Sequence, residues 1–203
     1  MLFEVIIMRD KDVRESVWRW LEVIHAGDSD TLMLDELGVL NGATRIDIAV
    51  INGQIEGFEL KSEKDTLERL PAQRDIYNKV FNKVSLVVAE NHCAAAIDIV
   101  PKWWGIMLAK PAKDRVVVAW KRKPKLNPSL DAATVASLLW RDEALGVLER
   151  YNAASGVRSK PREALYERLA SFLDLNTLST EVRNILKTRA NWRVDRRSQQ
   201  CGD

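Results

Sequence analysis

Apolar residues recur at two periods along the chain, and their order predicts an α/β fold. In residues 11–24 they recur at helical spacing, whereas residues 45–51 alternate isoleucine and valine with polar or small residues, as a half-buried strand does. Further strands are expected at residues 31–40, 54–61, 84–89, 104–108 and 116–120, and further helices at residues 65–81 and 91–99. The apolar run VSLVVA within 84–89 is typical of a central strand covered on both faces.

From residue 129 the pattern changes to helices joined by short loops. Helices are expected at residues 132–151, 159–173 and 177–192. The predicted organisation is a first domain at 1–122, a basic linker at 123–128, a helical subdomain at 129–192 and a basic, flexible tail at 193–203.

The dipeptide Asn52-Gly53 predicts a tight hairpin between two neighbouring strands. A two-residue type I′ turn needs positive φ at both central residues, and Asn-Gly is its strongest signal. The strand after the turn carries Glu59 and Lys61 two positions apart, so they share a face. If the hairpin pairs in register, that face can also carry Asp47, and two carboxylates and one ammonium would converge.

Asp47 and Glu59 are therefore candidate ligands of one hard cation. Magnesium takes oxygen ligands and keeps several waters. One or two protein carboxylates together with a substrate phosphate are therefore a typical ligand set. We expect Mg²⁺, with Mn²⁺ able to substitute. The metal would polarise a phosphoryl oxygen and activate a water, which Lys61 would orient. The expected chemistry is metal-dependent phosphodiester hydrolysis.

A polar stripe follows on the helix expected at residues 65–81. Arg69, Gln73 and Tyr77 are spaced by four and share one side of it. Arginine and glutamine hydrogen-bond phosphate, and tyrosine adds a hydroxyl and a stacking face. The stripe predicts contacts to a nucleic-acid strand beside the carboxylates. Pro71 indicates either the start of this helix or a kink.

The pattern of Asp47, then Glu59-Leu60-Lys61, then Gln73 with Tyr77 resembles the PD-(D/E)XK, or restriction-endonuclease-like, nuclease superfamily. The wider run, from DELG through FELKSEKDTLERL to RSKPREALYERL, is similar to a family of small, mostly uncharacterised bacterial proteins with that core. The resemblance implies a restriction-endonuclease-like core, a mixed central sheet flanked by helices, to which the C-terminal all-helical subdomain is appended.

The resemblance also implies roles for individual residues. The implied catalytic residues are Asp47, Glu59, Lys61, Gln73 and Tyr77, and the implied metal ligands are Asp47, Glu59 and the backbone carbonyl of Leu60. An upstream glutamate often completes such a site; Glu36 is the first choice and Glu15 competes with it. The superfamily's proline before the aspartate is absent, because Ile46 stands there.

Composition adds little to this picture. The chain is 46% hydrophobic and 30% charged, which is ordinary for a globular protein, and a net charge of +2 does not by itself argue for nucleic acid. The basic run at residues 121–125 is either a phosphate contact or a solvated hinge, so Lys121, Arg122 and Lys123 are candidate nucleic-acid contacts. Two cysteines far apart fit a reducing cytoplasm, and no stretch has the length and composition of a membrane helix.

Two functions remain open at this point. The leading hypothesis is a magnesium-dependent DNA phosphodiesterase, cutting as an endonuclease or exonuclease. The alternative is a nuclease-fold protein that only binds nucleic acid or another protein. In both cases nucleic acid, with DNA favoured, is the expected partner, a membrane is not expected to be one, and a homodimer is compatible with cleavage of two strands.

Overall fold

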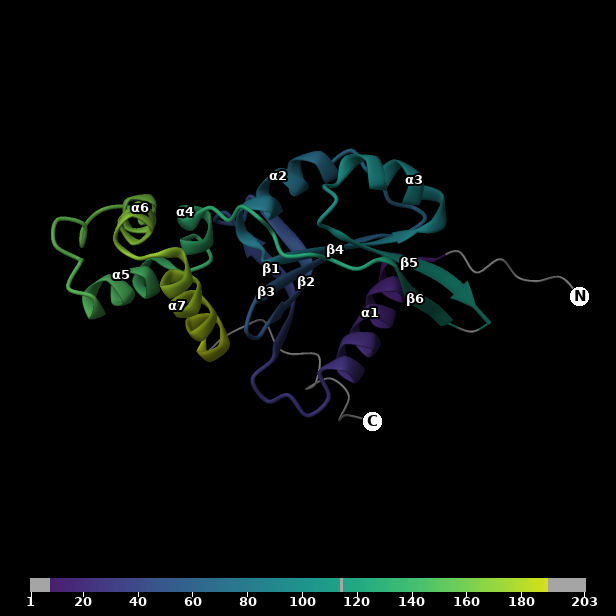
Figure 1. Ribbon diagram of the computed structural model, residues 1–203, viewed down its shortest axis with the longest axis horizontal. Coiled ribbons are helices and arrows are strands. Elements are labelled where there is room, and N and C mark those ends of the chain that lie inside the picture. The colour runs from purple at the N-terminus through teal and green to yellow at the C-terminus, as the bar shows by residue number, and fades with distance from the viewer. Residues whose placement is uncertain (1–7, 114, 190–203) are drawn as a thin grey trace, which may run out of the picture.

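The computed structural model describes residues 8–113 and 115–189 of the 203. It confirms the α/β class: a six-stranded mixed sheet with flanking helices precedes a C-terminal helical region (Figure 1). The elements are α1 (Asp10–Ile24), β1 (Leu32–Val39), β2 (Thr44–Ile51), β3 (Ile55–Lys61), α2 (Leu70–Val80), β4 (Lys83–Ala89), α3 (Glu90–Ile99), β5 (Gly105–Ala112), β6 (Arg115–Arg122), α4 (Ala132–Ala136), α5 (Arg141–Arg150), α6 (Arg162–Phe172) and α7 (Leu175–Thr188).

The six strands lie in the sheet in their order along the chain. Strands β1, β2 and β3 pair antiparallel, β3, β4 and β5 pair parallel, and β6 returns antiparallel to β5. Parallel neighbours need a crossover, which α2 and α3 provide. Both helices cover one face of the sheet and α1 covers the other (Figure 1), so β4 is buried on both faces, as its apolar run predicts.

The hairpin between β2 and β3 forms, but its turn differs from the predicted two-residue turn. Ile51 pairs with Ile55, which leaves three residues in the loop. The side chain of Asn52 accepts a hydrogen bond from the backbone N–H of Gln54 at 3.0 Å, and neither Asn52 nor Gly53 has a positive φ. The asparagine therefore closes the turn through its side chain, and the type I′ geometry is not needed.

Two helix predictions also need correction. The helix expected at 65–81 begins only at Leu70, with Pro71 in its first turn, where a missing N–H is tolerated. The single helix expected at 132–151 is two helices, α4 and α5. The break lies at 137–140, where the hydroxyl of Ser137 bonds back to the helix and the N–H of Trp140 donates to Glu143 at 2.7 Å, which starts a new helix.

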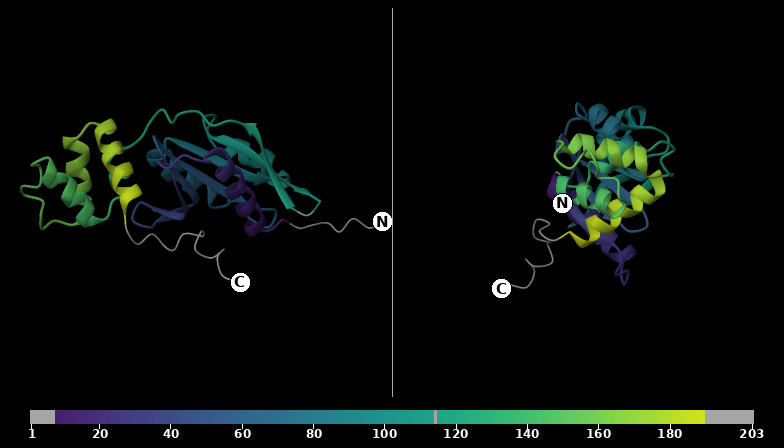
Figure 2. Two further views of the ribbon diagram at one scale, coloured as in Figure 1. Left: turned by 90° about the horizontal axis from the view of Figure 1, so that it is seen from below. Right: turned by 90° about the vertical axis from the view of Figure 1, so that its left-hand side faces the viewer.

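The helical region shares one apolar core with the sheet. Buried residues of α4 to α7 form a continuous cluster with those of α2, α3 and one sheet face, and α1 closes a separate cluster on the other face. The segment before α4 is held in place: the side chain of Asn127 donates to the carbonyls of Asn78 and Phe81 at 2.7 and 2.9 Å. Figure 2 shows this segment, which runs along the molecule from the end of β6 to α4 in the helical region.

Several predictions fall outside these observations. The basic tail at 193–203 lies outside the described residues, and the domain boundaries and the homodimer stay predictions. Among residues 8–113 and 115–189, none of the helices combines the length and apolar composition that a membrane span requires.

Candidate functional site

A cavity of about 520 Å³ lies where α1, the ends of β2 and β3, and the start of α2 meet. It is called the carboxylate cavity here, after the acids in its wall. Its charged lining residues are Asp10, Glu36, Asp47, Glu59 and Asp65 on the acidic side and Arg14, Arg45, Lys61 and Arg69 on the basic side. The predicted residues Asp47, Glu59, Lys61, Gln73 and Arg69 are therefore brought together.

Glu59 lies at the buried end of the cavity and is fully engaged by protein donors. Lys61 Nζ lies 2.8 Å from Glu59 Oε1, and Gln73 Nε2 donates to the same oxygen at 2.7 Å. The hydroxyl of Tyr77 lies 3.0 Å from Oε2. The side chains of Glu59 and Lys61 are 3% and 4% exposed, so their ion pair is buried and depends on these extra hydrogen bonds to offset desolvation.

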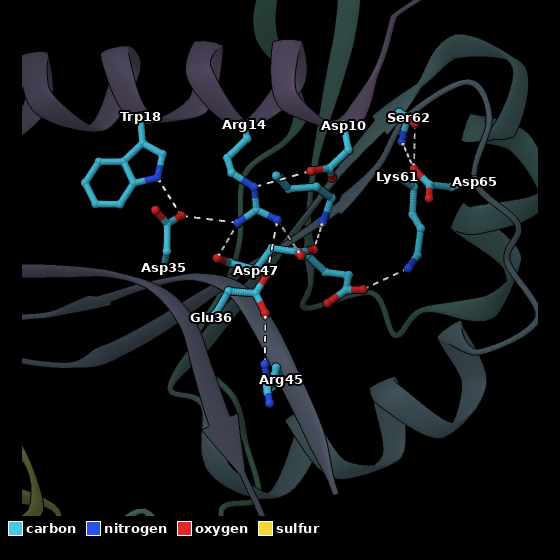
Figure 3. A network of polar contacts seen from close by, with 12 residues as sticks. Asp10, Arg14, Trp18, Asp35, Glu36, Arg45, Asp47, Lys61, Ser62 and Asp65 are labelled. Atoms are coloured by element: carbon cyan, nitrogen blue, oxygen red, sulfur yellow. Dashed lines mark hydrogen bonds and ion pairs between the residues drawn. The ribbon is translucent and has the colours of Figure 1, made fainter. Parts of the chain in front are cut away.

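Both carboxylate oxygens of Asp47 also accept hydrogen bonds from the protein, one of them from helix α1 on the other face of the sheet. Its Oδ2 accepts the backbone N–H of Leu60 at 2.8 Å, and its Oδ1 lies 2.9 Å from Nη2 of Arg14 on α1 (Figure 3). A second nitrogen of Arg14 donates to the backbone carbonyl of Asp47 at 2.9 Å. Asp47 is thus held from the α1 side of the sheet, whereas Gln73 and Tyr77 hold Glu59 from the α2 side.

Arg14 lines the cavity and was not among the residues that the sequence pattern indicated. Its guanidinium contacts four carboxylates, those of Asp10, Asp35, Glu36 and Asp47, at 3.3, 3.2, 3.4 and 2.9 Å (Figure 3). A signal was available, because Asp10 and Arg14 are four apart, the spacing of an ion pair on one side of a helix, but the helix was expected to begin at residue 11 and not at Asp10. Burial alone would lower the pKa of Arg14, but the surrounding carboxylates raise it overall.

The carboxylate of Asp47 titrates near neutrality in this setting. Burial and the neighbouring charge of Glu59 raise the pKa of Asp47 to about 7, although the N–H of Leu60 and the charge of Arg14 act in the opposite direction. Burial, followed by the charge of Glu59, also raises the pKa of the Tyr77 hydroxyl. Tyr77 therefore stays neutral and acts as a hydrogen-bond donor to Glu59.

These residues do not, as arranged, fit a magnesium ion. Every carboxylate oxygen of Asp47 and Glu59 already accepts a hydrogen bond from the protein, and the guanidinium of Arg14 lies against Asp47, where an ion would have to bind. Within the described residues, no three Asp, Glu, His or Cys side chains are grouped closely enough to hold a metal. The proposed Mg²⁺ and Mn²⁺ site therefore stays a prediction that requires Arg14 to move.

The remaining candidates divide between the cavity and the rest of the surface. Glu36 lines the cavity and contacts Arg14 and Arg45, whereas Glu15 pairs with Lys11 and Arg19 on α1 and does not line it. Tyr77 is fully buried, and its single hydroxyl hydrogen is shared between the carbonyl of Arg45 at 2.6 Å and Oε2 of Glu59 at 3.0 Å, so it positions protein groups.

The predicted basic contacts lie elsewhere. Lys121, Arg122 and Lys123 do not line the carboxylate cavity. Arg122 donates to the carbonyls of Trp104 and Pro101 at 2.8 and 3.2 Å, which ties the end of β6 to the start of β5. This arginine has a structural contact that the sequence did not indicate.

Comparisons with known proteins assign the chain to a different family from the predicted one. The family model described as bacteriophage P4 protein cII matches residues 7–198. Protein cII of enterobacteria phage P4 is 27% identical over 183 residues, which cover 90% of this chain and 68% of the phage protein. A solved structure, the SPO1766 protein of unknown function from Silicibacter pomeroyi, has 15% identity and a TM-score of 0.44 over 77% of this chain and 98% of its own.

These matches overturn the nuclease prediction. Both the family and the relative that match are described as the P4 cII protein, and neither description mentions a nuclease. The resemblance to the PD-(D/E)XK superfamily and to a bacterial family with that core, the assignment as a hydrolase, and the magnesium-dependent DNA phosphodiesterase are therefore wrong. The physical reason is that an Asp followed by Glu-x-Lys is a weak pattern, and here Arg14 and Lys61 neutralise its acids within the protein.

Proposed function

We propose that this chain, which belongs to the bacteriophage P4 cII protein family, binds the phosphate backbone of nucleic acid, and of DNA in particular, at its carboxylate cavity without cutting it. One observation carries the proposal: the acids at the centre of the cavity are neutralised by the protein, whereas two arginines at its wall remain exposed. Positive charge is therefore offered to a ligand locally, at Arg45 and Arg69, although five acids and four basic residues line the cavity as a whole.

The two exposed arginines are Arg45 and Arg69. Arg45 has a long ion pair of 3.8 Å with Glu36, and its side chain is 53% exposed, so this pair adds little stability and can open. No salt bridge joins Arg69 to another described residue. Arginine carries five N–H donors in a planar fork that matches two phosphate oxygens, which suits both residues to a phosphodiester backbone.

The position of Arg45 is fixed from inside the protein. Its backbone carbonyl accepts the hydroxyl of buried Tyr77, which also holds Glu59. Arg69 directly precedes the first residue of α2 and lies one helical turn before Gln73. The two arginines thus extend from strand β2 and helix α2 beside one cavity, an arrangement that supports binding of a continuous backbone over its mouth.

Fluorescence anisotropy with labelled DNA tests this proposal, using the wild type, the Arg45→Ala/Arg69→Ala double variant and an Arg19→Ala control. Arg19 is exposed on α1 and does not line the cavity. We expect wild-type affinity to fall steeply with salt, and the double variant to bind more weakly with a salt slope smaller by about one per lost phosphate contact. The Arg19→Ala variant should bind like the wild type.

The same titration is run with magnesium and with EDTA, and the DNA is recovered afterwards. We expect equal affinity in both buffers and DNA of unchanged length. Affinity of the double variant equal to that of the wild type would show that the cavity is not the binding surface, and absence of any DNA binding would refute the proposed function.

A further inference from the structure

A second cavity, of about 430 Å³, lies between the β1–β2 turn and the helical region and takes no part in the function proposed above. Three arginines line it, namely Arg141, Arg162 and Arg189, and none of the described residues in its wall is an aspartate or glutamate. We name it the arginine cavity. Its volume falls within the range of about 300–1,000 Å³ that is usual for small-ligand sites.

Trp140 forms an aromatic platform in the wall of this cavity. It is 54% exposed, which is unusual for so large an apolar side chain. The guanidinium of Arg189 lies 4.4 Å from its ring centroid and is itself held by Glu143 at 2.8 and 2.6 Å and by the carbonyl of Leu138 at 2.9 Å. The guanidinium of Arg189 therefore packs against the Trp140 ring and holds it in place. The exposed part of the Trp140 ring remains available for stacking.

Arg141 and Arg162 bring positive charge to the same cavity from the starts of α5 and α6. Each forms an ion pair with the acid that follows it, Asp142 at 3.2 Å and Glu163 at 3.1 Å. The arginine side chains are 40% and 48% exposed, and pairs between such exposed neighbours contribute little. Arg141 also donates through Nη2 to the carbonyls of Arg158 and Lys160 at 2.5 and 3.3 Å, which fixes its position at the cavity. A phosphate group can therefore replace Asp142 and Glu163 as the acidic partner while Arg141 stays in place.

The two cavities meet at the turn between β1 and β2, because Gly42 lines both. The turn is tied to the helical region through Tyr166, whose hydroxyl donates to the carbonyl of Leu139 at 2.8 Å and contacts the Asn41 side chain at 3.4 Å. A ligand that passes over this turn would meet Arg45 and Arg69 on one side of the turn and Arg141 and Arg162 on the other.

We propose that the arginine cavity binds a nucleotide of single-stranded nucleic acid, with its base stacked on Trp140 and its phosphate on Arg141 and Arg162. The proposal rests on the proposed function and narrows it, because it selects single strands over duplex. A base in a duplex is already stacked and paired, whereas an unpaired base can leave the strand to stack on an aromatic ring whatever its identity.

The test compares labelled single-stranded DNA with the matched duplex, using Trp140→Ala, Trp140→Phe and Phe172→Ala variants of the full chain. Phe172 is an aromatic residue of similar exposure, 53%, that does not line the cavity. We expect Trp140→Ala to weaken single-strand binding by at least about fivefold, the lower limit for loss of one stacked base, with duplex binding unchanged. Trp140→Phe should retain most of the affinity, and Phe172→Ala all of it.

The Arg162→Glu variant and the Arg45→Ala/Arg69→Ala variant separate the two proposals. If the double variant loses affinity for DNA while Trp140→Ala and Arg162→Glu bind single strands like the wild type, the arginine cavity is not a nucleotide site and the proposed function stands. If no variant alters binding, both proposals fail. A free mononucleotide that competes as well as the oligonucleotide would overturn the assignment to a strand.

Discussion

At the scale of single residues, Arg14 determines the chemistry of the carboxylate cavity. It supplies the positive charge that a bound cation would otherwise supply, and it does so from a helix that packs on the other face of the sheet from Gln73. Removal of such a partner would leave buried carboxylates uncompensated, which is strongly unfavourable. The arginine thus stabilises the fold and at the same time occupies the position nearest to Asp47.

Asp47 should make the stability of the protein depend on pH. Its pKa is about 7 in the folded protein against 3.8 as the ordinary value, so the folded state binds the proton more tightly than the unfolded chain. The resulting stabilisation is fully present below about pH 4 and is lost as the pH rises through 7. We expect the free energy of unfolding of the wild type to fall relative to Asp47→Asn by up to about 1.4 kcal/mol per pH unit across this window.

Urea denaturation of both proteins at several pH values from about 5 to 8 measures this difference. An Asp98→Asn variant is the control, because Asp98 is exposed on α3, and its profile should parallel that of the wild type. A constant difference between wild type and Asp47→Asn would mean that Asp47 is ionised throughout.

The residues of the carboxylate cavity could be predicted only in part from the sequence. Asp47, Glu59, Lys61 and Gln73 lie close together as their strand and helix spacings predicted, because these spacings are short and local. Arg14 could not be placed, since its contacts with Asp47 join residues 33 positions apart and depend on how α1 packs on the sheet. The pattern of acids and lysine was correct in space, but the chemistry inferred from it was wrong.

At the scale of elements, hydrophobic periodicity predicted which strands and helices exist better than where they end. The turn at Asn52 and the break after α4 both depend on side-chain hydrogen bonds that periodicity does not contain. The order of helix, three strands, helix and strand was predicted, and the alternation of helix and strand correctly indicated parallel pairing around β4.

Two glycines offer a test of how tightly these elements pack. A Cβ on Gly105, at the start of β5, would lie 2.8 Å from Pro124, 2.8 Å from Ser85 and 2.9 Å from Trp120, whereas a Cβ on Gly146 in α5 would meet no atom within 4 Å. We expect Gly105→Ala to lower the free energy of unfolding by about 1–3 kcal/mol through overpacking. Gly146→Ala should raise it by about 0.5–1 kcal/mol, because alanine favours the helix.

Both effects are measured by urea denaturation under one set of conditions. If Gly105→Ala were as stable as the wild type, the segment around Pro124 would have to move away from the sheet at little cost. If Gly146→Ala were destabilising, the helix propensity of alanine would not determine stability at this position.

At the scale of the whole molecule, the sheet and the helical region share an apolar core across the predicted linker at residues 123–128. Leu178 on α7 is fully buried in the same cluster as residues of α2 and the sheet. We expect Leu178→Ala to lower the free energy of unfolding by about 2–5 kcal/mol. Because the cluster is continuous, the lower stability should accelerate hydrogen exchange of the amides in β4 and in α6 to the same extent.

A Leu21→Ala variant provides the comparison, since Leu21 is buried on α1 against the opposite sheet face. It should destabilise the same two sets of amides together. If Leu178→Ala accelerated exchange in α6 and left β4 protected, the helical region would be an independent folding unit and the predicted boundary near residue 123 would be supported.

The β1–β2 turn has a consequence for how the two cavities respond to one another. Gly42 has a φ of +87° and the two residues before it, Leu40 and Asn41, also have positive φ, a conformation that residues other than glycine rarely adopt. A ligand that shifts the turn from one side changes the wall of the other cavity at the same time. Such linkage is reciprocal: whatever factor occupancy of one cavity applies to affinity at the second, occupancy of the second applies to the first.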